Sequence, residues 1–216
     1  AAKFYTDTCS IDYSENIIKR NTFVISKALG FNIPYTDILG KKPFLYFNSK
    51  AIFTPIENRK PNIVFIPGAS FKSKIYPVEN YIQLANELDA NIVILWGNPK
   101  EKLMAEQVQA CSKNVSVSSQ LTLDELKSVI VQMDLVIGGD TGPTHMAWAL
   151  NIPSIILFGS TPGYRVSFLT NINKIIESDS KVNPYKTNKN DFSIKTIKVG
   201  DIVKITKELL KDKLWK

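Results

Sequence analysis

The chain has 216 residues and a formal net charge of +7, with 44% hydrophobic and 22% charged residues. This composition excludes a disordered chain, and no window reaches the roughly 18 uninterrupted apolar residues of a membrane-spanning helix. Two cysteines and a single histidine, His145, exclude a disulfide framework and a zinc site built from these residue types. Neither end carries a signal-peptide or lipidation pattern, so we expect a cytoplasmic location.

The excess of positive charge lies mostly at the end of the chain, where residues 171–216 contain 11 lysines and 6 acidic residues. Such a bias fits nucleic acid, an anionic membrane surface or an anionic substrate. Arginine is scarce, and the lysines alternate with acidic and apolar residues, so we expect no nucleic-acid partner. A solvated lysine-rich face is the simplest interpretation, and a weak membrane-surface role stays open.

The first sixty residues predict little regular structure. Apolar residues at helical spacing predict a helix over residues 14–29, which Gly30 is placed to end. Over residues 31–60, prolines and glycines interrupt the pattern, and the apolar run at 44–47 is compatible with one edge strand. We therefore interpret residues 31–60 as a linker.

From residue 62 the chain alternates between strands and helices. Apolar, mostly β-branched runs predict strands at 63–66, 92–95, 115–117, 135–137, 155–158 and 175–176. Amphipathic stretches predict helices at 77–88, 99–111, 122–132, 141–150 and 198–214. Strands that are apolar throughout and alternate with helices indicate a parallel sheet covered on both faces. The expected fold class is α/β, with a doubly wound parallel sheet.

Doubly wound sheets bind ligands beyond the carboxyl ends of their strands. The most informative loop there is residues 138–145, GGDTGPTH, which follows a buried strand and enters a helix. The free N–H groups and the dipole of such a helix start suit a phosphate or diphosphate, and the side chains of Thr141, Thr144 and His145 add further donors. The alternative is that Asp140 only caps the helix and His145 is a packed helix residue.

Three more loops at strand ends are polar. Residues 67–74, PGASFKSK, combine small residues with Lys74 and suit an anion, although the spacing of a Walker P-loop is absent. Glu101 follows the second strand, where nucleotide folds hold ribose hydroxyls, or it merely complements a helix dipole. Leu121, in the loop at 118–122, covers an adenine face or acts as a hydrophobic staple.

Together these motifs resemble glycosyltransferase family 9, the lipopolysaccharide core heptosyltransferases, which have a GT-B fold. The first loop of the family resembles Pro67-Gly68-Ala69-Ser70, Lys74 and Tyr76-Pro77. Its signature Asp-Thr/Ser-Gly-x-x-His, followed by Pro, a β-run and Gly-x-Thr/Ser, resembles residues 140–145, Pro153, 155–158 and Gly159-Ser160-Thr161. The resemblance covers residues 14–177, and it is closer to heptosyltransferase I than to II at Phe4-Tyr5, Lys19-Arg20 and Trp96-Gly97-x-Pro99.

The resemblance implies two Rossmann-like domains facing across a cleft, with this chain as the C-terminal portion. Residues 1–60 would be the end of the N-terminal acceptor domain and the linker, 61–180 the nucleotide-sugar-binding domain, and 181–216 a polar loop and closing helix. The Gly-rich loop that carries the general base of the family has no counterpart here, so we expect this chain alone to bind donor but transfer poorly. Because it starts at Ala1, we interpret the chain as processed or as the later part of a longer protein.

The implied activity is inverting transfer of heptose from ADP-L-glycero-D-manno-heptose to the Kdo-lipid A inner core, at the inner face of the inner membrane. The implied catalytic residues are Lys74, His145 and Asp140. The implied substrate contacts are Ser70, Lys74, Thr141, Gly142 and His145 for the diphosphate, Glu101 for ribose, Leu121 for adenine and Asp140 for heptose. Phe71 and Ile75 depart from the family, parts of which carry polar or charged residues at these positions.

We expect no cofactor and no metal, because the cationic groups of the site can offset the charge of the leaving diphosphate. We also expect a monomer. Other GT-B enzymes, such as heptosyltransferase II or a sugar-nucleotide 2-epimerase, remain alternatives, as do a non-catalytic nucleotide-binding module and a basic domain that docks on a membrane or partner. The absence of G-x-G-x-x-G argues against a redox protein that binds NAD.

Overall fold

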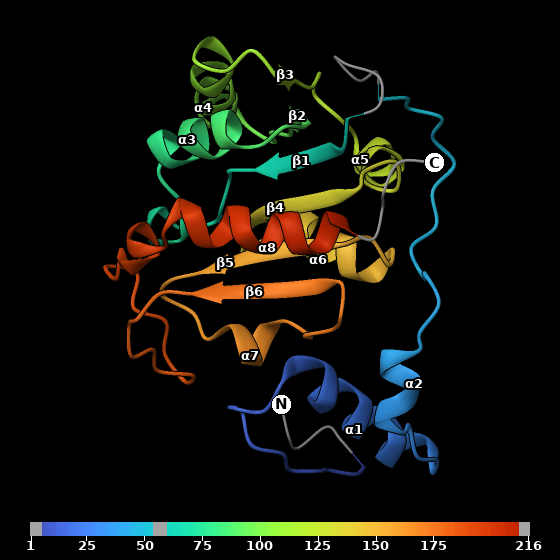
Figure 1. Ribbon diagram of the computed structural model, residues 1–216. Coiled ribbons are helices and arrows are strands. Elements are labelled where there is room, and N and C mark those ends of the chain that lie inside the picture. Colours follow the sequence, from blue (N-terminus) through green and yellow to red (C-terminus); the bar gives the residue numbers. More distant parts are fainter. Residues whose placement is uncertain (1–5, 54–59, 212–216) are drawn as a thin grey trace.

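The computed structural model describes residues 6–53 and 60–211, and a six-stranded sheet forms its centre (Figure 1). The strands are β1 (Asn62–Ile66), β2 (Asn91–Ile94), β3 (Val115–Val117), β4 (Leu135–Gly139), β5 (Ser154–Phe158) and β6 (Asn173–Glu177). Their order is β3-β2-β1-β4-β5-β6, and each neighbouring pair is parallel. The chain reverses its direction of winding between β1 and β4, which is where such sheets bind ligands.

Helices cover both faces of the sheet, which confirms the expected doubly wound α/β fold. One face packs against α3 (Val78–Glu87), α4 (Pro99–Ala110) and α8 (Val199–Lys211), and the other against α5 (Leu123–Ile130) and α6 (Gly142–Ala149). Successive residues of one strand enter opposite cores, as Ile63 and Phe65 do on one face and Val64 and Ile66 on the other. This arrangement explains why the strands are apolar throughout.

Helix caps decide the ends of the elements. The first helix, α1, spans Ile17–Leu29 instead of 14–29, because the side chain of Asn16 accepts a hydrogen bond from the N–H of Ile18 and so caps its start. Gly30 ends α1 as predicted, in the left-handed conformation with φ of 72°.

The predicted first turns of two further helices were tested by the structure, and one of the two predictions is confirmed. Pro77 was expected in the first turn of a helix, but it lies at the N-cap position just before α3. The predicted capping box before α5 is confirmed: Thr122 accepts from the N–H of Glu125, and the carboxylate of Glu125 accepts from the N–H of Thr122.

The predicted linker is more structured than its sequence indicates. It contains the short helix α2 (Tyr35–Leu39), which the sequence interpretation did not identify. The edge strand expected at 44–47 is wrong, because in the described part of the chain this segment pairs with no strand of the sheet. The segment is instead held by a hydrogen bond from the N–H of Phe44 to the carbonyl of Ala149, which ends α6.

Short helical turns complete the carboxyl edge of the sheet. These turns are η2 (Lys72–Lys74), α7 (Gly163–Val166) and η3 (Ser193–Thr196), the last within a segment expected to be loop-like. Among the described residues, none of the helices is long and apolar enough to cross a lipid bilayer. Phe4-Tyr5, residues 54–59 of the predicted linker and residues 212–214 of the last predicted helix lie outside the described residues.

Candidate functional site

A cavity of about 470 Å³ opens at the carboxyl edge of the sheet, beyond the ends of the neighbouring strands β1 and β4. This volume is in the range of small-molecule sites, which is roughly 300–1,000 Å³. The loops after β1, β2 and β4 form its walls, together with residues from the start of α6 and from α5 and the loop before it. Six of the residues predicted for the site line it, namely Ser70, Glu101, Leu121, Asp140, Thr141 and Gly142.

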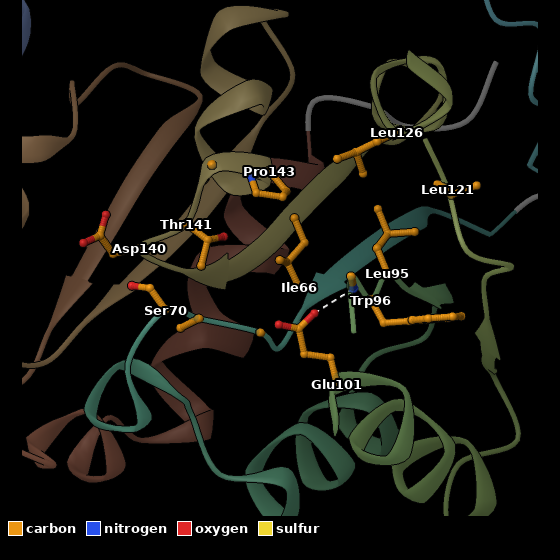
Figure 2. A pocket seen from close by; sticks show the side chains of 14 residues that line it. Ile66, Ser70, Leu95, Trp96, Glu101, Leu121, Leu126, Asp140, Thr141 and Pro143 are labelled. Atoms are coloured by element: carbon orange, nitrogen blue, oxygen red, sulfur yellow. Dashed lines mark hydrogen bonds between the residues drawn. The ribbon is translucent and has the colours of Figure 1, made fainter. Parts of the chain in front are cut away.

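The two ends of the cavity differ in chemistry (Figure 2). Leu95, Leu121 and Leu126 gather at one end and make it apolar, while Ser70 lies with Thr141 and Asp140 at the other. Trp96 also lines the cavity, and its indole N–H donates to the carbonyl of Ser118 at 2.8 Å. The sequence interpretation assigned no ligand contact to Leu95, Trp96 or Leu126, although it noted Trp96 within a motif of the resemblance.

Glu101 lies between these two ends and presents a carboxylate to the cavity (Figure 2). Its Oε2 accepts a hydrogen bond of 2.7 Å from the N–H of Gly97. A Cβ at position 68 would lie 2.2 Å from Oε1 of Glu101, so this carboxylate can occupy its place only because Gly68 has no side chain. Glu101 is in the first turn of α4 and so also complements the helix dipole, which makes the two interpretations compatible.

Lys74 and His145 are not among the residues that line the cavity, but both contact Asp140, which does line it. Lys74 Nζ lies 2.5 Å from Oδ2 of Asp140, and His145 Nε2 lies 3.0 Å from Oδ1. The hydroxyl of Thr161 donates to the same Oδ2 at 3.2 Å. The side chains of Lys74 and Asp140 are only 12% and 11% exposed, so this is a largely desolvated charge cluster.

The charge state of Asp140 follows from this surrounding. Burial alone raises its pKa, but the hydrogen bonds from His145 and Lys74 and the charge of Lys74 outweigh burial and lower the pKa to about 2. Asp140 is therefore ionised throughout the physiological pH range. It can accept hydrogen bonds and stabilise positive charge, but it holds no proton to donate.

The start of α6 provides the remaining polar wall. Thr141 occupies the N-cap position, and its hydroxyl lies 3.1 Å from that of Thr144 instead of capping the helix. The alternative that Asp140 serves only as the cap is wrong, because its carboxylate binds the cluster described above. A Cβ on Gly138 would lie 2.7 Å from the hydroxyl of Thr144, so a glycine here allows α6 to pack close to β4.

The cysteines and acidic residues add no second site. Cys9 and Cys111 are both exposed free thiols. Within residues 6–53 and 60–211, no group of three or more His, Cys, Asp or Glu side chains is arranged to hold a metal ion.

Comparison with known proteins identifies the family of this chain. The family model for glycosyltransferase family 9 (heptosyltransferase) matches residues 1–195. The chain belongs to glycosyltransferase family 9. Lipopolysaccharide heptosyltransferase 1 of Campylobacter coli is 36% identical to it over 227 residues, which cover 98% of this chain and 66% of that protein. The Salmonella typhimurium enzyme of the same name is 27% identical over 169 residues, covering 76% of this chain and 51% of that protein.

Solved structures agree with this membership at the level of fold. The Escherichia coli heptosyltransferase WaaC solved with ADP has a TM-score of 0.71 and 19% identity, covering 96% of this chain and 61% of that one. Escherichia coli heptosyltransferase II has a TM-score of 0.60 and 21% identity, covering 73% and 48%. This chain thus spans about 48% to 66% of the length of these relatives.

Proposed function

We propose that this chain is the donor-binding part of a heptosyltransferase that moves heptose from ADP-L-glycero-D-manno-heptose to the Kdo-lipid A inner core, with inversion. The observation that carries the proposal is the order of chemistry along the cavity, from the leucine end through Glu101 to Thr141 and Asp140 (Figure 2). A nucleotide sugar has the same order: base, ribose hydroxyls, diphosphate, sugar. The relatives named lipopolysaccharide heptosyltransferase 1, and WaaC solved with ADP and with ADP-2-deoxy-2-fluoro heptose, support this choice of donor.

In this proposal the chain supplies one side of the reaction. Residues 61–180 bind the donor, residues 1–60 are the end of the acceptor domain and the linker, and residues 181–216 form the closing loop and helix. The general base that activates the acceptor hydroxyl belongs to a part of the enzyme outside this chain. We further propose a monomer at the cytoplasmic face of the inner membrane, which light scattering and membrane fractionation of the complete enzyme would test.

The polar end of the cavity suits the departure of ADP. The leaving diphosphate gains negative charge while the sugar carbon gains positive charge. Lys74 and His145 would exchange part of their contact with Asp140 for phosphate oxygens, and the free N–H of Gly142 would donate as well. Preorganised donors of this kind contribute roughly 3–4 kcal/mol each to catalysis. Asp140, being ionised, would bind heptose hydroxyls and stabilise the positive charge on the sugar.

Direct binding of nucleotides tests the site. Isothermal titration calorimetry of the chain should show binding of ADP but not of UDP, and ADP-heptose should raise its melting temperature where UDP sugars do not. Lys74→Ala should weaken ADP binding at least tenfold, whereas Lys204→Ala, an exposed lysine on α8, should not. Unchanged binding by Lys74→Ala would remove Lys74 from the site, and a preference for UDP would favour another sugar-nucleotide enzyme such as a 2-epimerase.

We also propose that transfer needs no metal ion, because Lys74 and the start of α6 supply positive charge at the diphosphate and His145 supplies a hydrogen-bond donor. The need for a metal ion should be tested, because one protein of similar fold is described as iron-containing. This protein is TibC of enterotoxigenic Escherichia coli, with a TM-score of 0.53 and 12% identity. The complete enzyme should keep its activity in excess chelator. Loss of activity that magnesium or iron restores would contradict the proposal.

A further inference from the structure

A second concentration of positive charge lies at the same edge of the sheet, outside the cavity. It combines Phe71 and Lys72 from the loop after β1 with Lys189, Phe192 and Lys195 from the segment between β6 and α8, and we call these five residues the lysine rim. The two parts are far apart in sequence, but η2 and η3 lie against each other. Figure 1 shows the segment between β6 and α8 at the arrowhead end of the strands.

Aromatic rings, not carboxylates, contact two of the three lysines of the rim. Lys189 Nζ lies 4.5 Å from the centre of the Phe71 ring, and Lys195 Nζ lies 5.1 Å from that of Phe192. These are cation–π distances, and such contacts orient an ammonium group without neutralising it. In the part of the chain that the structure describes, Lys72, Lys189 and Lys195 form no ion pair.

The nearby acidic residues leave the rim positive. Asp191 lies beside Phe192, but its carboxylate accepts hydrogen bonds from Ser180 and Ser193 within its own segment. Glu79, at the start of α3, shares a surface hollow of about 500 Å³ with Lys72, Phe192 and Lys195. One carboxylate therefore faces two lysines in the hollow, with Lys189 as a third nearby.

A single side chain, that of Lys74, connects the rim to Asp140 at the polar end of the cavity. Lys74 Nζ, which binds Asp140 at 2.5 Å, also lies 5.8 Å from the centre of the Phe71 ring. Phe71 therefore contacts both Lys74 of the Asp140 cluster and Lys189 of the rim. A molecule that reacts with a sugar held at Asp140 would meet this aromatic and basic surface as it approaches.

We propose that the lysine rim binds the anionic saccharide that accepts the transferred sugar, through carboxylate or phosphate groups of that acceptor. This inference rests on the proposed function, because it takes Asp140 as the place of the donor sugar. Lysines are suited to the task, since a mobile ammonium group follows an anion at varied distances. The aromatic ring of Phe71 adds a flat apolar surface for the face of a sugar.

The shape of the rim favours a saccharide over a bilayer. A surface that inserts into a membrane needs protruding apolar side chains beside its lysines. Within the rim, Phe192 is 42% exposed, whereas Phe71 is partly buried beneath Lys189. Lys72 and Lys195 line a surface hollow, which fits a compact charged group better than it fits a flat layer of lipid.

Charge reversal in the complete enzyme tests the rim. The double variant Lys189→Glu/Lys195→Glu should raise the KM for Kdo2-lipid A in detergent micelles at least tenfold, with ADP affinity unchanged within twofold. The matched control is Lys204→Glu/Lys207→Glu, which makes the same change of charge at exposed positions of α8 and should leave that KM within twofold. An acceptor KM that the rim variant does not change, or that the control raises equally, would overturn the inference.

A second measurement separates the possible causes of failure. Binding to phosphatidylglycerol vesicles without acceptor should be the same for the wild type and the rim variant. If the variant loses vesicle binding while its acceptor KM is unchanged, the rim is a membrane surface and the inference is wrong. If the wild type itself does not bind ADP, the proposed function fails first, and this result is independent of the rim.

Discussion

Replacing Asp140 with Asn should destabilise the protein at neutral pH by roughly 2 kcal/mol. The side chain is 11% exposed, and although burial alone raises its pKa, hydrogen bonds from His145 and Lys74 and the charge of Lys74 lower that pKa from 3.8 to about 2. At about 1.4 kcal/mol for each pH unit, this difference corresponds to roughly 2 kcal/mol of stability when the carboxylate is ionised. The variant also leaves Lys74 without its partner, which adds to the cost.

The stabilisation that Asp140 provides should decrease as the pH falls. Because the pKa of Asp140 is lower in the folded state than in the unfolded state, its contribution is complete above about pH 5 and disappears as the pH falls through about 4 to 2. Urea unfolding, followed by tryptophan fluorescence, measures the difference in unfolding free energy between wild type and Asp140→Asn. That difference should be largest at pH 7 and about half as large at pH 3.

Two controls make the result interpretable. Asp179→Asn removes an exposed carboxylate and should change the unfolding free energy by less than about 0.5 kcal/mol. In a double-mutant cycle, Asp140→Asn should cost less when Lys74 has already been replaced by Met, with a coupling energy of about 1–3 kcal/mol. A difference between wild type and Asp140→Asn that stays constant from pH 7 to pH 3, or a coupling energy near zero, would refute the reasoning.

Three further substitutions test other parts of the structure. Gly68→Ala should displace the carboxylate of Glu101, from which a Cβ would lie 2.2 Å, and weaken ADP binding about tenfold by calorimetry; unchanged affinity would contradict the role of Glu101. Thr161→Val removes the hydrogen bond to Asp140 and should lower kcat of the complete enzyme several-fold. Thr161→Ser keeps the hydroxyl and should keep the kcat of the wild type. Thr122→Ala loses the capping box of α5 and should lower the unfolding free energy by about 1 kcal/mol; equal urea midpoints would count against the cap.

The six strands and the five longer helices of residues 62–211 could be predicted because their patterns are local, whereas the short turns η2, α7 and η3 were not predicted. The strands are mostly apolar because the sheet is covered on both faces, and the longer helices bury side chains against it. The prediction was poorer before residue 62, where α2 was missed and an edge strand was wrongly expected at 44–47. That segment is held by contacts with α5 and α6, and no local pattern records such distant partners.

The candidate site was predicted only in its outline. Loops at strand ends pointed to Glu101, Leu121 and the start of α6, because polar and small residues at these places are uncommon in a packed core. The apolar wall with Leu95 was missed, since a leucine at a strand end has the same sequence pattern whether it faces a core or a ligand. Thr161 was noted within a motif, but nothing in the sequence connects its hydroxyl to Asp140.

By itself the sequence determined the fold class, the family and the loops that carry the chemistry, because these depend on periodicity, caps and motifs within a few residues. The tertiary structure alone decided that β4 lies beside β1, since strands that are apolar on both faces do not specify their neighbours. That pairing brings the ammonium group of Lys74 to Asp140, 66 residues away in the chain, where the imidazole of His145 contacts the same buried carboxylate. The order of strands thus sets the charge of the site, through burial and proximity that no linear pattern contains.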